Sequence, residues 1–224
     1  MNKNSKAIFF IPFRSGSKGF KDKNIINYKN KPLYMHTVNK ALETKLGEVF
    51  VSTDYDADSI KEIPNNINLI KRKKGLAEDD TEIAEVIADF IDNNISEELI
   101  IILLQVTSPN RSKKQIIEAL SLFKSSNFDL VMSVNKTSSS ILKYGRLNQN
   151  KKFQPISDTA FCFKNRQDLP EVYKPNGSIY IFNSRWFKLK RSFETENIGA
   201  YVMDQSSSID IDSMEDLVLL EKLK

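Results

Sequence analysis

Apolar and polar residues follow one another along the chain in blocks that predict alternating strands and helices. Continuous apolar runs at 7–12 and 99–104 are typical of strands that are buried on both faces. Together with these two, the expected strands are 48–53, 67–72, 128–135, 177–182 and 199–204. Helical spacing of apolar residues predicts helices at 32–45, 56–63, 79–94, 112–126 and 213–224. This alternation predicts an α/β, Rossmann-like fold with a mostly parallel sheet.

The alternation is interrupted between about 136 and 175, where the sequence is polar and carries little periodicity. We therefore expect a single domain over 1–224 with one small inserted lobe at 136–175. Within the helix expected at 79–94, Asp80 or Thr81 is placed to cap the first turn. Ser213 is similarly placed to cap the last helix.

The composition of the chain narrows the classes of function that the protein can have. Lys and Arg number 33 against 29 Asp and Glu, a mixed surface with a net charge of +4 that suits small anionic ligands better than nucleic acid. Cys162 is the single cysteine, so the chain cannot form an intrachain disulfide. The longest purely apolar run has six residues, 99–104, which is too short to span a membrane. A cytoplasmic protein is expected.

The polar loop after the first strand reads RSGSKGFKDKN and precedes a helix. Glycines and serines allow backbone N–H groups to turn toward a ligand, and lysines and an arginine add positive charge, a combination that suits a triphosphate. The four cations are Arg14, Lys18, Lys21 and Lys23. The loop is neither a Walker A loop nor a dinucleotide fingerprint. A solvated basic turn is the simpler alternative, and for Lys21 it is the preferred one.

Asp210 and Asp212 lie one residue apart in SSIDIDSMEDL. In an extended segment, residues i and i+2 point to the same side, so the two carboxylates converge. Two carboxylates with phosphate oxygens are the ligands that Mg2+ prefers. The alternative is helix capping by Asp212, a role that Ser213 can fill alone.

Six segments together resemble the CMP-N-acylneuraminate synthetase family, over nearly the whole chain from Ile8 to Leu217. IPFRSGSKGFKDKN resembles IPARxGSKGxxxKN, LLQVTSPNRS resembles LLQPTSPLRT, and SSIDIDSMEDL resembles DIDxxxDL. VSTDYDADSI, IKRKKGLAEDDT and KPNGSIYIF resemble VSTDxxxI, RPxxLAxDxT and RPNGAIYI. For Asp54 and Asp56 of the VSTD segment, capping of the following helix is the preferred interpretation. The resemblance implies the nucleotide-diphospho-sugar transferase type of fold.

The resemblance also implies a set of site residues. Those implied for the nucleotide are Pro12, Phe13, Arg14, Ser15, Gly16, Ser17, Lys18, Lys23, Asn24, Arg72, Gln105, Thr107 and Ser108. Those implied for the sugar are Gln105, Lys143, Arg166, Asn176, Tyr180 and Phe193. Lys23, Arg14, Asp210 and Asp212 are implied as catalytic, with the two aspartates binding Mg2+, or Mn2+ in its place. The lobe is expected to reach across a homodimer. Phe13 stands where the family usually has alanine, so we expect it to reshape the base pocket.

The expected reaction is transfer of CMP from CTP to the anomeric hydroxyl of a nine-carbon 2-keto-3-deoxy sugar acid of sialic, legionaminic or pseudaminic type, with release of pyrophosphate. For the general base that activates the sugar hydroxyl, two alternatives stay open: a metal-bound hydroxide and the substrate's own carboxylate. One alternative is a cytidylyltransferase for an eight-carbon ulosonic acid, against which the GSKG and PNG segments argue. Another is a non-catalytic nucleotide-binding protein on the same fold, which the joint presence of Lys23, Gln105, Asp210 and Asp212 disfavours.

Overall fold

A seven-stranded sheet forms the centre of the protein in the computed structural model, which describes residues 5–16, 20, 22–60 and 62–222. Its strands are β1 (Ala7–Pro12), β4 (Val49–Thr53), β5 (Asn68–Lys71), β6 (Ile100–Leu104), β7 (Leu130–Thr137), β10 (Val172–Asn183) and β11 (Ile198–Val202). They lie in the order β11-β7-β10-β6-β1-β4-β5. Every neighbouring pair is parallel except the two that β10 makes with β6 and β7. The expectation of a mostly parallel α/β sheet is confirmed.

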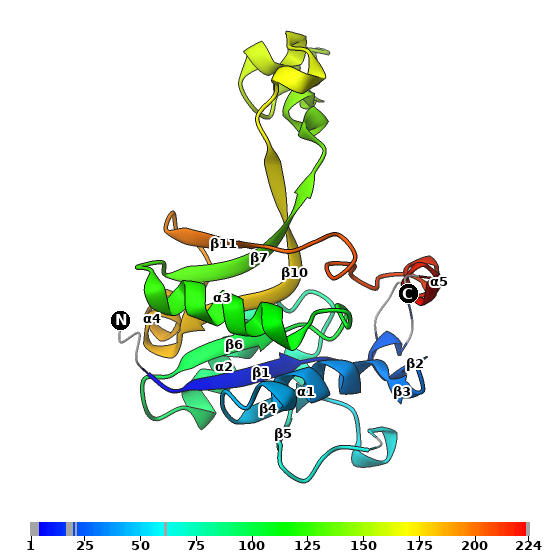
Figure 1. Ribbon diagram of the computed structural model, residues 1–224, viewed down its shortest axis with the longest axis vertical. Coiled ribbons are helices and arrows are strands. Elements are labelled where there is room, and N and C mark those ends of the chain that lie inside the picture. The colour runs from blue at the N-terminus through cyan, green and yellow to red at the C-terminus, as the bar shows by residue number, and fades with distance from the viewer. Residues whose placement is uncertain (1–4, 17–19, 21, 61, 223–224) are drawn as a thin grey trace.

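Helices cover both faces of this sheet (Figure 1). On one face, α1 (Leu33–Thr44), α3 (Lys113–Ser125) and α5 (Met214–Lys222) contribute to a core with the residues of β1 and β6 that point that way. On the other face, α2 (Ile83–Asn94) and α4 (Ser184–Lys190) pack against the alternate residues of the same strands. Phe9 belongs to the first core and Phe10 to the second, because side chains alternate along a strand. A short ladder of β2 (Asn27–Tyr28) and β3 (Lys31–Pro32) precedes α1.

Two helix boundaries differ from the sequence expectation. The helix expected from 79 begins only at Ile83, and its cap is Glu82, which exchanges a reciprocal bond with Glu85, so capping by Asp80 or Thr81 is wrong. The residues before it form a 3-10 turn and a loop that lies beside the ends of β1 and β4. Between 56 and 63, the described residues form only a 3-10 turn, Ala57–Ser59.

An arm projects from the sheet where the sequence pattern is interrupted. β7 and β10 continue past the sheet edge as a pair, with Val172 opposite Thr137, and the chain between them forms the outer part of the arm (Figure 1). That outer part contains 3-10 turns and the hairpin of β8 (Gly145–Leu147) and β9 (Phe153–Pro155). It exposes large apolar side chains, among them Phe163 at 86% and Leu147 at 70%.

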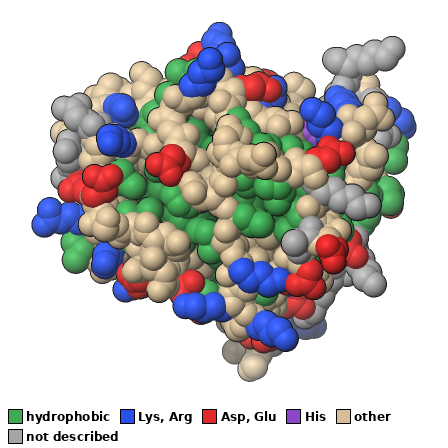
Figure 2. Space-filling model, turned by 90° about the horizontal axis from the view of Figure 1, so that it is seen from below, with side chains coloured by type: hydrophobic (Ala, Val, Ile, Leu, Met, Phe, Trp, Pro, Cys, Tyr) green, Lys and Arg blue, Asp and Glu red, His purple; other side chains and the backbone are tan. Residues whose placement is uncertain are grey.

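The end of the molecule opposite the arm carries the edge strand β5. Seen from that end, apolar side chains form a band across the surface with charged side chains around it (Figure 2). Leu69 on β5 is 46% exposed. No helix in the part of the chain that the structure describes has the length and apolar character needed to cross a membrane.

Candidate active site

A cavity of about 270 Å3 lies at the carboxyl ends of β1 and β6, and we call it the nucleotide cavity. Open α/β sheets place their ligands at this edge. Eight residues that the sequence implied for the nucleotide line it: Pro12, Phe13, Arg14, Lys23, Asn24, Arg72, Gln105 and Thr107. Ile83 and Val86, from the first turn of α2, supply an apolar wall. The cavity therefore combines cations with an apolar wall, an arrangement that suits a nucleotide.

Two side chains hold the loop after β1 in place through hydrogen bonds with its backbone. Asp54 accepts from Ser15 N at 2.8 Å and from Ser15 Oγ at 2.5 Å. Asn24 is 6% exposed and donates through Nδ2 to Arg14 O at 2.8 Å. Gly16 has φ of 71°, the left-handed region that glycine adopts without strain. These contacts fix the start of the loop against the sheet, whereas Ser17 and Lys18, which were implied for the phosphates, lie outside the described residues.

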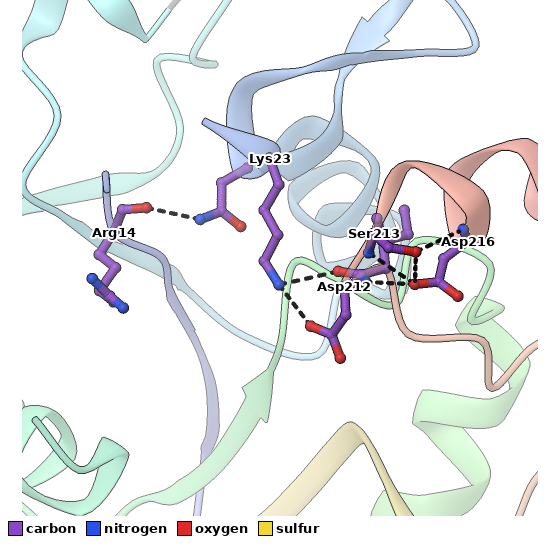
Figure 3. A network of polar contacts seen from close by, with 7 residues as sticks. Arg14, Lys23, Asp212, Ser213 and Asp216 are labelled. Atoms are coloured by element: carbon purple, nitrogen blue, oxygen red, sulfur yellow. Dashed lines mark hydrogen bonds and ion pairs between the residues drawn. The ribbon is translucent and has the colours of Figure 1, made fainter. Parts of the chain in front are cut away.

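Lys23 joins the loop to the acidic segment before α5. Its Nζ donates to Asp212 Oδ1 at 2.8 Å and to Ile211 O at 3.1 Å, across almost the whole sequence (Figure 3). Asp216 fixes the same segment, because its carboxylate accepts from Asp212 N and Ser213 N while Ser213 Oγ caps α5. The expected cap at Ser213 is confirmed, and Asp212 is left with its carboxylate directed at Lys23.

Asp210 is the more buried carboxylate of the pair. Burial raises its pKa above the usual range, Asp212 adds to the rise, and a hydrogen bond from Thr107 opposes it. Its Oδ1 is buried and has no partner among the described residues. A carboxylate oxygen in that position is stabilised by a cation, and Asp212 is one residue away, so the pair fits a Mg2+ ion that is otherwise bound by phosphate oxygens. Within the described ranges, no group of three or more His, Cys, Asp or Glu side chains is placed to hold a metal.

Arg72 is a buried cation of the nucleotide cavity. It is 7% exposed, its NH2 group donates to Ser52 O at 3.1 Å, and its Nε has no partner among the described residues. Burial lowers its pKa to about 10, against the opposing charge of Asp54. A phosphate or carbonyl oxygen in the cavity would complete its hydrogen bonds. Arg14, in contrast, makes an ion pair with Asp79 at 2.5 Å and also donates to Ala77 O.

Four residues implied for the nucleotide lie partly or wholly outside the nucleotide cavity. The Phe13 ring is 4% exposed and stacks on Tyr34 with ring centroids 5.1 Å apart, so most of its bulk lies in the core. Ser108 is fully buried, and its hydroxyl has no partner among the described residues. Ser15 and Gly16 line an adjoining cavity of about 360 Å3 together with Arg14.

A third cavity, of about 460 Å3, lies beside the bulge of β10, and we call it the β10 cavity. It is lined by Asn176, Gly177, Asp210 and Asp212, among others. Gly177 has φ of 75°, and a Cβ built there would lie 3.1 Å from Gln105 Oε1. Gln105 itself lines the nucleotide cavity, so the two cavities adjoin where this glutamine meets β10. The role implied for Gln105, between nucleotide and sugar, stays a prediction.

The other residues implied for the sugar fall into two groups. Tyr180 stacks on Phe193 with centroids 5.6 Å apart, and its pKa is raised by burial and by the nearby charge of Asp210, which puts this pair beside the acidic residues. Asn176 is buried and accepts from Ser133 Oγ and Ser178 N.

Lys143 and Arg166 form the second group and lie in the arm. Lys143 donates to Lys164 O, and Arg166 donates to Ser138 Oγ at 3.3 Å, so both side chains make hydrogen bonds within the arm. The structure does not bring them together with Gln105 and Asp210 in one chain.

Sequence reasoning missed the roles of two residues that shape the site. The sequence favours Asp54 as a helix cap, although the VSTD resemblance points to it, and in the structure it binds the loop after β1. Asp79 stands at the aspartate of the RPxxLAxDxT pattern and pairs with Arg14, a contact that the pattern alone did not identify. Arg111, in the LLQVTSPNRS segment, is 0% exposed and donates to the backbone carbonyls of Gln105, Ser108 and Ser178, so it joins β6 to the β10 bulge.

Several known proteins are similar to this chain in sequence. The sequence profile of the cytidylyltransferase family matches residues 8–223. An N-acylneuraminate cytidylyltransferase of Streptococcus agalactiae serotype V is 33% identical over 224 residues, which are 95% of this chain and 52% of that protein. This chain therefore spans about half the length of that relative. A CMP-N,N'-diacetyllegionaminic acid synthase of Legionella pneumophila is 31% identical, with 97% of this chain and 96% of that protein covered.

A solved structure supports the fold. The structure of a CMP:2-keto-3-deoxy-manno-octonic acid synthetase complexed with CTP superposes with a TM-score of 0.73, with 98% of each chain covered and 18% sequence identity. At that identity the likeness shows the fold alone.

Proposed function

Because this chain belongs to the cytidylyltransferase family, we propose that it transfers CMP from CTP to the anomeric hydroxyl of a nine-carbon 2-keto-3-deoxy sugar acid and releases pyrophosphate. The observation that carries the proposal is the contact of Lys23 with Asp212, because Lys23 lines the nucleotide cavity while Asp210 and Asp212 line the adjoining β10 cavity. Relatives named for sialic, legionaminic and pseudaminic acids supply the substrate class. We place the reaction in the cytoplasm, where CTP is available.

The residues of the chain have distinct tasks in this reaction. Arg14, Lys23 and Arg72 bind the phosphates and stabilise the charge that develops when the sugar hydroxyl attacks the α-phosphorus. Lys23 and Arg14 are held by Asp212 and Asp79 in the structure, so a triphosphate competes with two carboxylates for them. Positioning and electrostatics perform the catalysis, because phosphoryl transfer needs little covalent participation from the protein. Asp210 and Asp212 would hold Mg2+, which neutralises phosphate charge when bound.

The sugar acid is proposed to lie on the β10 side of Gln105, near Tyr180, Phe193 and Asn176. Lys143 and Arg166 can join it only from a second subunit, because within one chain they lie in the arm. The apolar residues exposed on that arm support a homodimer, since solvent-exposed apolar clusters mark interaction surfaces. Arginine suits the sugar carboxylate because its planar fork binds both oxygens.

The test is pyrophosphate release with CTP, Mg2+ and a panel of sugar acids that includes sialic, legionaminic and pseudaminic acids and the eight-carbon 3-deoxy-manno-octulosonic acid. We expect release with at least one nine-carbon acid and little with the eight-carbon acid. Release with the eight-carbon acid alone would establish the alternative ulosonate enzyme. If no acid gives pyrophosphate release while the protein still binds CTP, the result would support a non-catalytic nucleotide-binding protein.

A further inference from the structure

The two residues directly after β4 contact the loop after β1 at both of its ends. At the start of the loop, Asp54 accepts from Ser15 N and Ser15 Oγ. At its end, the hydroxyl of Tyr55 donates to Asp22 Oδ1 at 3.0 Å. Lys71 on β5 donates through Nζ to Asp54 O at 2.9 Å and to Tyr55 O at 3.2 Å, which fixes the two residues to the sheet. The loop is therefore fastened at two points to one short segment.

Tyr55 is a rigid donor for the second of these contacts. It is 8% exposed, and its ring lies beside Phe13 with centroids 6.0 Å apart. Burial raises the pKa of its hydroxyl above the usual value, and the hydrogen bond to Asp22 adds to the rise, so the hydroxyl keeps its proton and donates. A tyrosine packed in this way fixes the position of its partner, because a side chain in a close-packed core has little freedom to move.

Asp22 bends the backbone directly before Lys23. Its φ of 53° and ψ of 24° lie in the left-handed region, which is unfavourable for most residues and is tolerated best, after glycine, by asparagine and aspartate. Its carbonyl accepts from Ile25 N at 3.0 Å, which closes the 3-10 turn Lys23–Ile25. A residue in this conformation persists where its surroundings hold it. The contact from Tyr55 therefore stabilises the turn from which the Lys23 side chain begins.

Lys23 is the cation that this turn directs. Its Nζ lies 2.8 Å from Asp212 Oδ1, and the residue lines the nucleotide cavity (Figure 3). Accurate placement matters for such a group, since a shift of about 1 Å can lower a rate about 100-fold. Tyr55 and Asp22 are not among the described residues that line the cavity. Both also fall at unspecified positions of the patterns VSTDxxxI and IPARxGSKGxxxKN, so the family resemblance gives neither of them a role.

We propose that Tyr55 and Asp22 are positioning residues for Lys23, because the hydrogen bond between them holds the left-handed turn that directs the Lys23 ammonium to the phosphates. This inference rests on the proposed function and deepens it, since it adds two residues to the same site that the family patterns leave open. Neither residue takes part in the chemistry itself. Loss of one hydroxyl outside the nucleotide cavity therefore lowers the rate without removing any group that touches the substrates.

The test is a double-mutant cycle between Tyr55→Phe and Lys23→Met. Tyr55→Phe keeps the ring, and we expect it to lower kcat about tenfold, with the acid that gives the highest turnover, because Lys23 is misplaced. Calorimetry with CTP and Mg2+ should show binding weakened about threefold, the size of one solvent-accessible ion pair. In the Lys23→Met background, Tyr55→Phe should change neither quantity, because the group that it positions is gone.

Matched variants separate this role from a general effect on folding. Tyr201→Phe, which removes a hydroxyl that β11 donates to Glu118 on α3, and Lys190→Gln on α4 should leave kcat and CTP affinity unchanged. Asp22→Asn keeps an acceptor oxygen and tolerates the left-handed region, so it should remain near normal, whereas Asp22→Ala should lose at least as much as Tyr55→Phe.

Four results would overturn the inference. Tyr55→Phe could retain the wild-type kcat and CTP affinity, or it could cause the same loss with and without Lys23, which would make its hydroxyl merely structural. Asp22→Asn could fail as badly as Asp22→Ala, or the wild-type protein could bind no CTP. If the wild-type protein binds CTP but turns over no acid, the proposed function fails while the binding cycle still decides this inference, so the two failures are distinguishable.

Discussion

At the scale of single residues, a substitution at Phe13 can distinguish a role in core packing from a role in nucleotide recognition. The ring stacks on Tyr34 and lies near Tyr55, in the first core, whereas the residue also borders the nucleotide cavity. Phe13→Ala should therefore lower the free energy of unfolding by about 3 kcal/mol, typical of a phenylalanine removed from a core. Because alanine is the family's usual residue there, the KM for CTP should change little. Urea unfolding and CTP kinetics measure the two effects, and a large rise in KM with unchanged stability would contradict the assignment.

Lys23 carries the strongest prediction for catalysis. Its Nζ contacts Asp212 and lines the nucleotide cavity, so it can move from that carboxylate to a phosphate. Lys23→Met should lower kcat about 100-fold, the effect of removing one group that stabilises transition-state charge. The Mg2+ concentration that gives half-maximal residual activity should not rise, because Lys23 no longer competes with Mg2+ for the Asp212 carboxylate. Lys190→Gln is the control, and retention of near-normal kcat by Lys23→Met would exclude Lys23 from the reaction.

At the scale of elements, Arg111 connects β6 with the bulge of β10. Its guanidinium is fully buried and donates to three backbone carbonyls, those of Gln105, Ser108 and Ser178. Arg111→Met leaves these oxygens unpaired and should lower the free energy of unfolding by about 3 kcal/mol. Arg111→Lys should lose less, because one ammonium can still reach some of the carbonyls. Urea denaturation measures the free energy of unfolding of the wild type and the two variants. Equal stability of the wild type and Arg111→Met would contradict this role.

The turn after β11 gives a prediction that depends on pH. Ser206 and Ser207 donate to Asp204 and lower its pKa to about 2. A carboxyl whose pKa is depressed by folding contributes stability above its unfolded value near 3.8, and that contribution is lost as the pH falls toward 2. Asp204→Asn should therefore melt below the wild type at pH 7. The difference should shrink between about pH 4 and pH 2. An equal difference at both ends of this range would contradict the assignment.

The same scale shows why some features were predictable from sequence and others were not. β1 and β6 were predicted because long apolar runs have few alternatives in an α/β protein, and Ser213 because its cap is a local pattern. The start of α2 was missed, because Glu82 caps it and the residues before it turn toward Arg14 instead. Contacts such as Asp79 with Arg14 depend on how distant segments meet, which periodicity does not encode. The family resemblance, rather than composition, supplied the residues of the nucleotide cavity.

At the scale of the whole molecule, the arm determines whether a site can be complete in one chain. Lys143 and Arg166, both implied for the sugar, make their side-chain hydrogen bonds with other arm residues, while Asp210 lines the β10 cavity. A dimer in which each arm reaches the other subunit would bring Lys143 and Arg166 of one subunit to Asp210 of the other. Phe163 and Leu147 would be covered in such a dimer, which removes their exposure.

Hybrid dimers test that arrangement directly. Arg166→Ala disables the arm that a chain gives to its partner, and Asp210→Ala disables the site that it keeps, so each homodimer should be inactive. In a hybrid, the chain with intact Asp210 receives an intact arm from its partner, and one of two sites works. With random pairing half of all dimers are hybrids, so coexpression should restore about a quarter of wild-type pyrophosphate release. Mixing without subunit exchange is the control, and a coexpressed pair as inactive as its parents would show that Arg166 does not serve the partner's site.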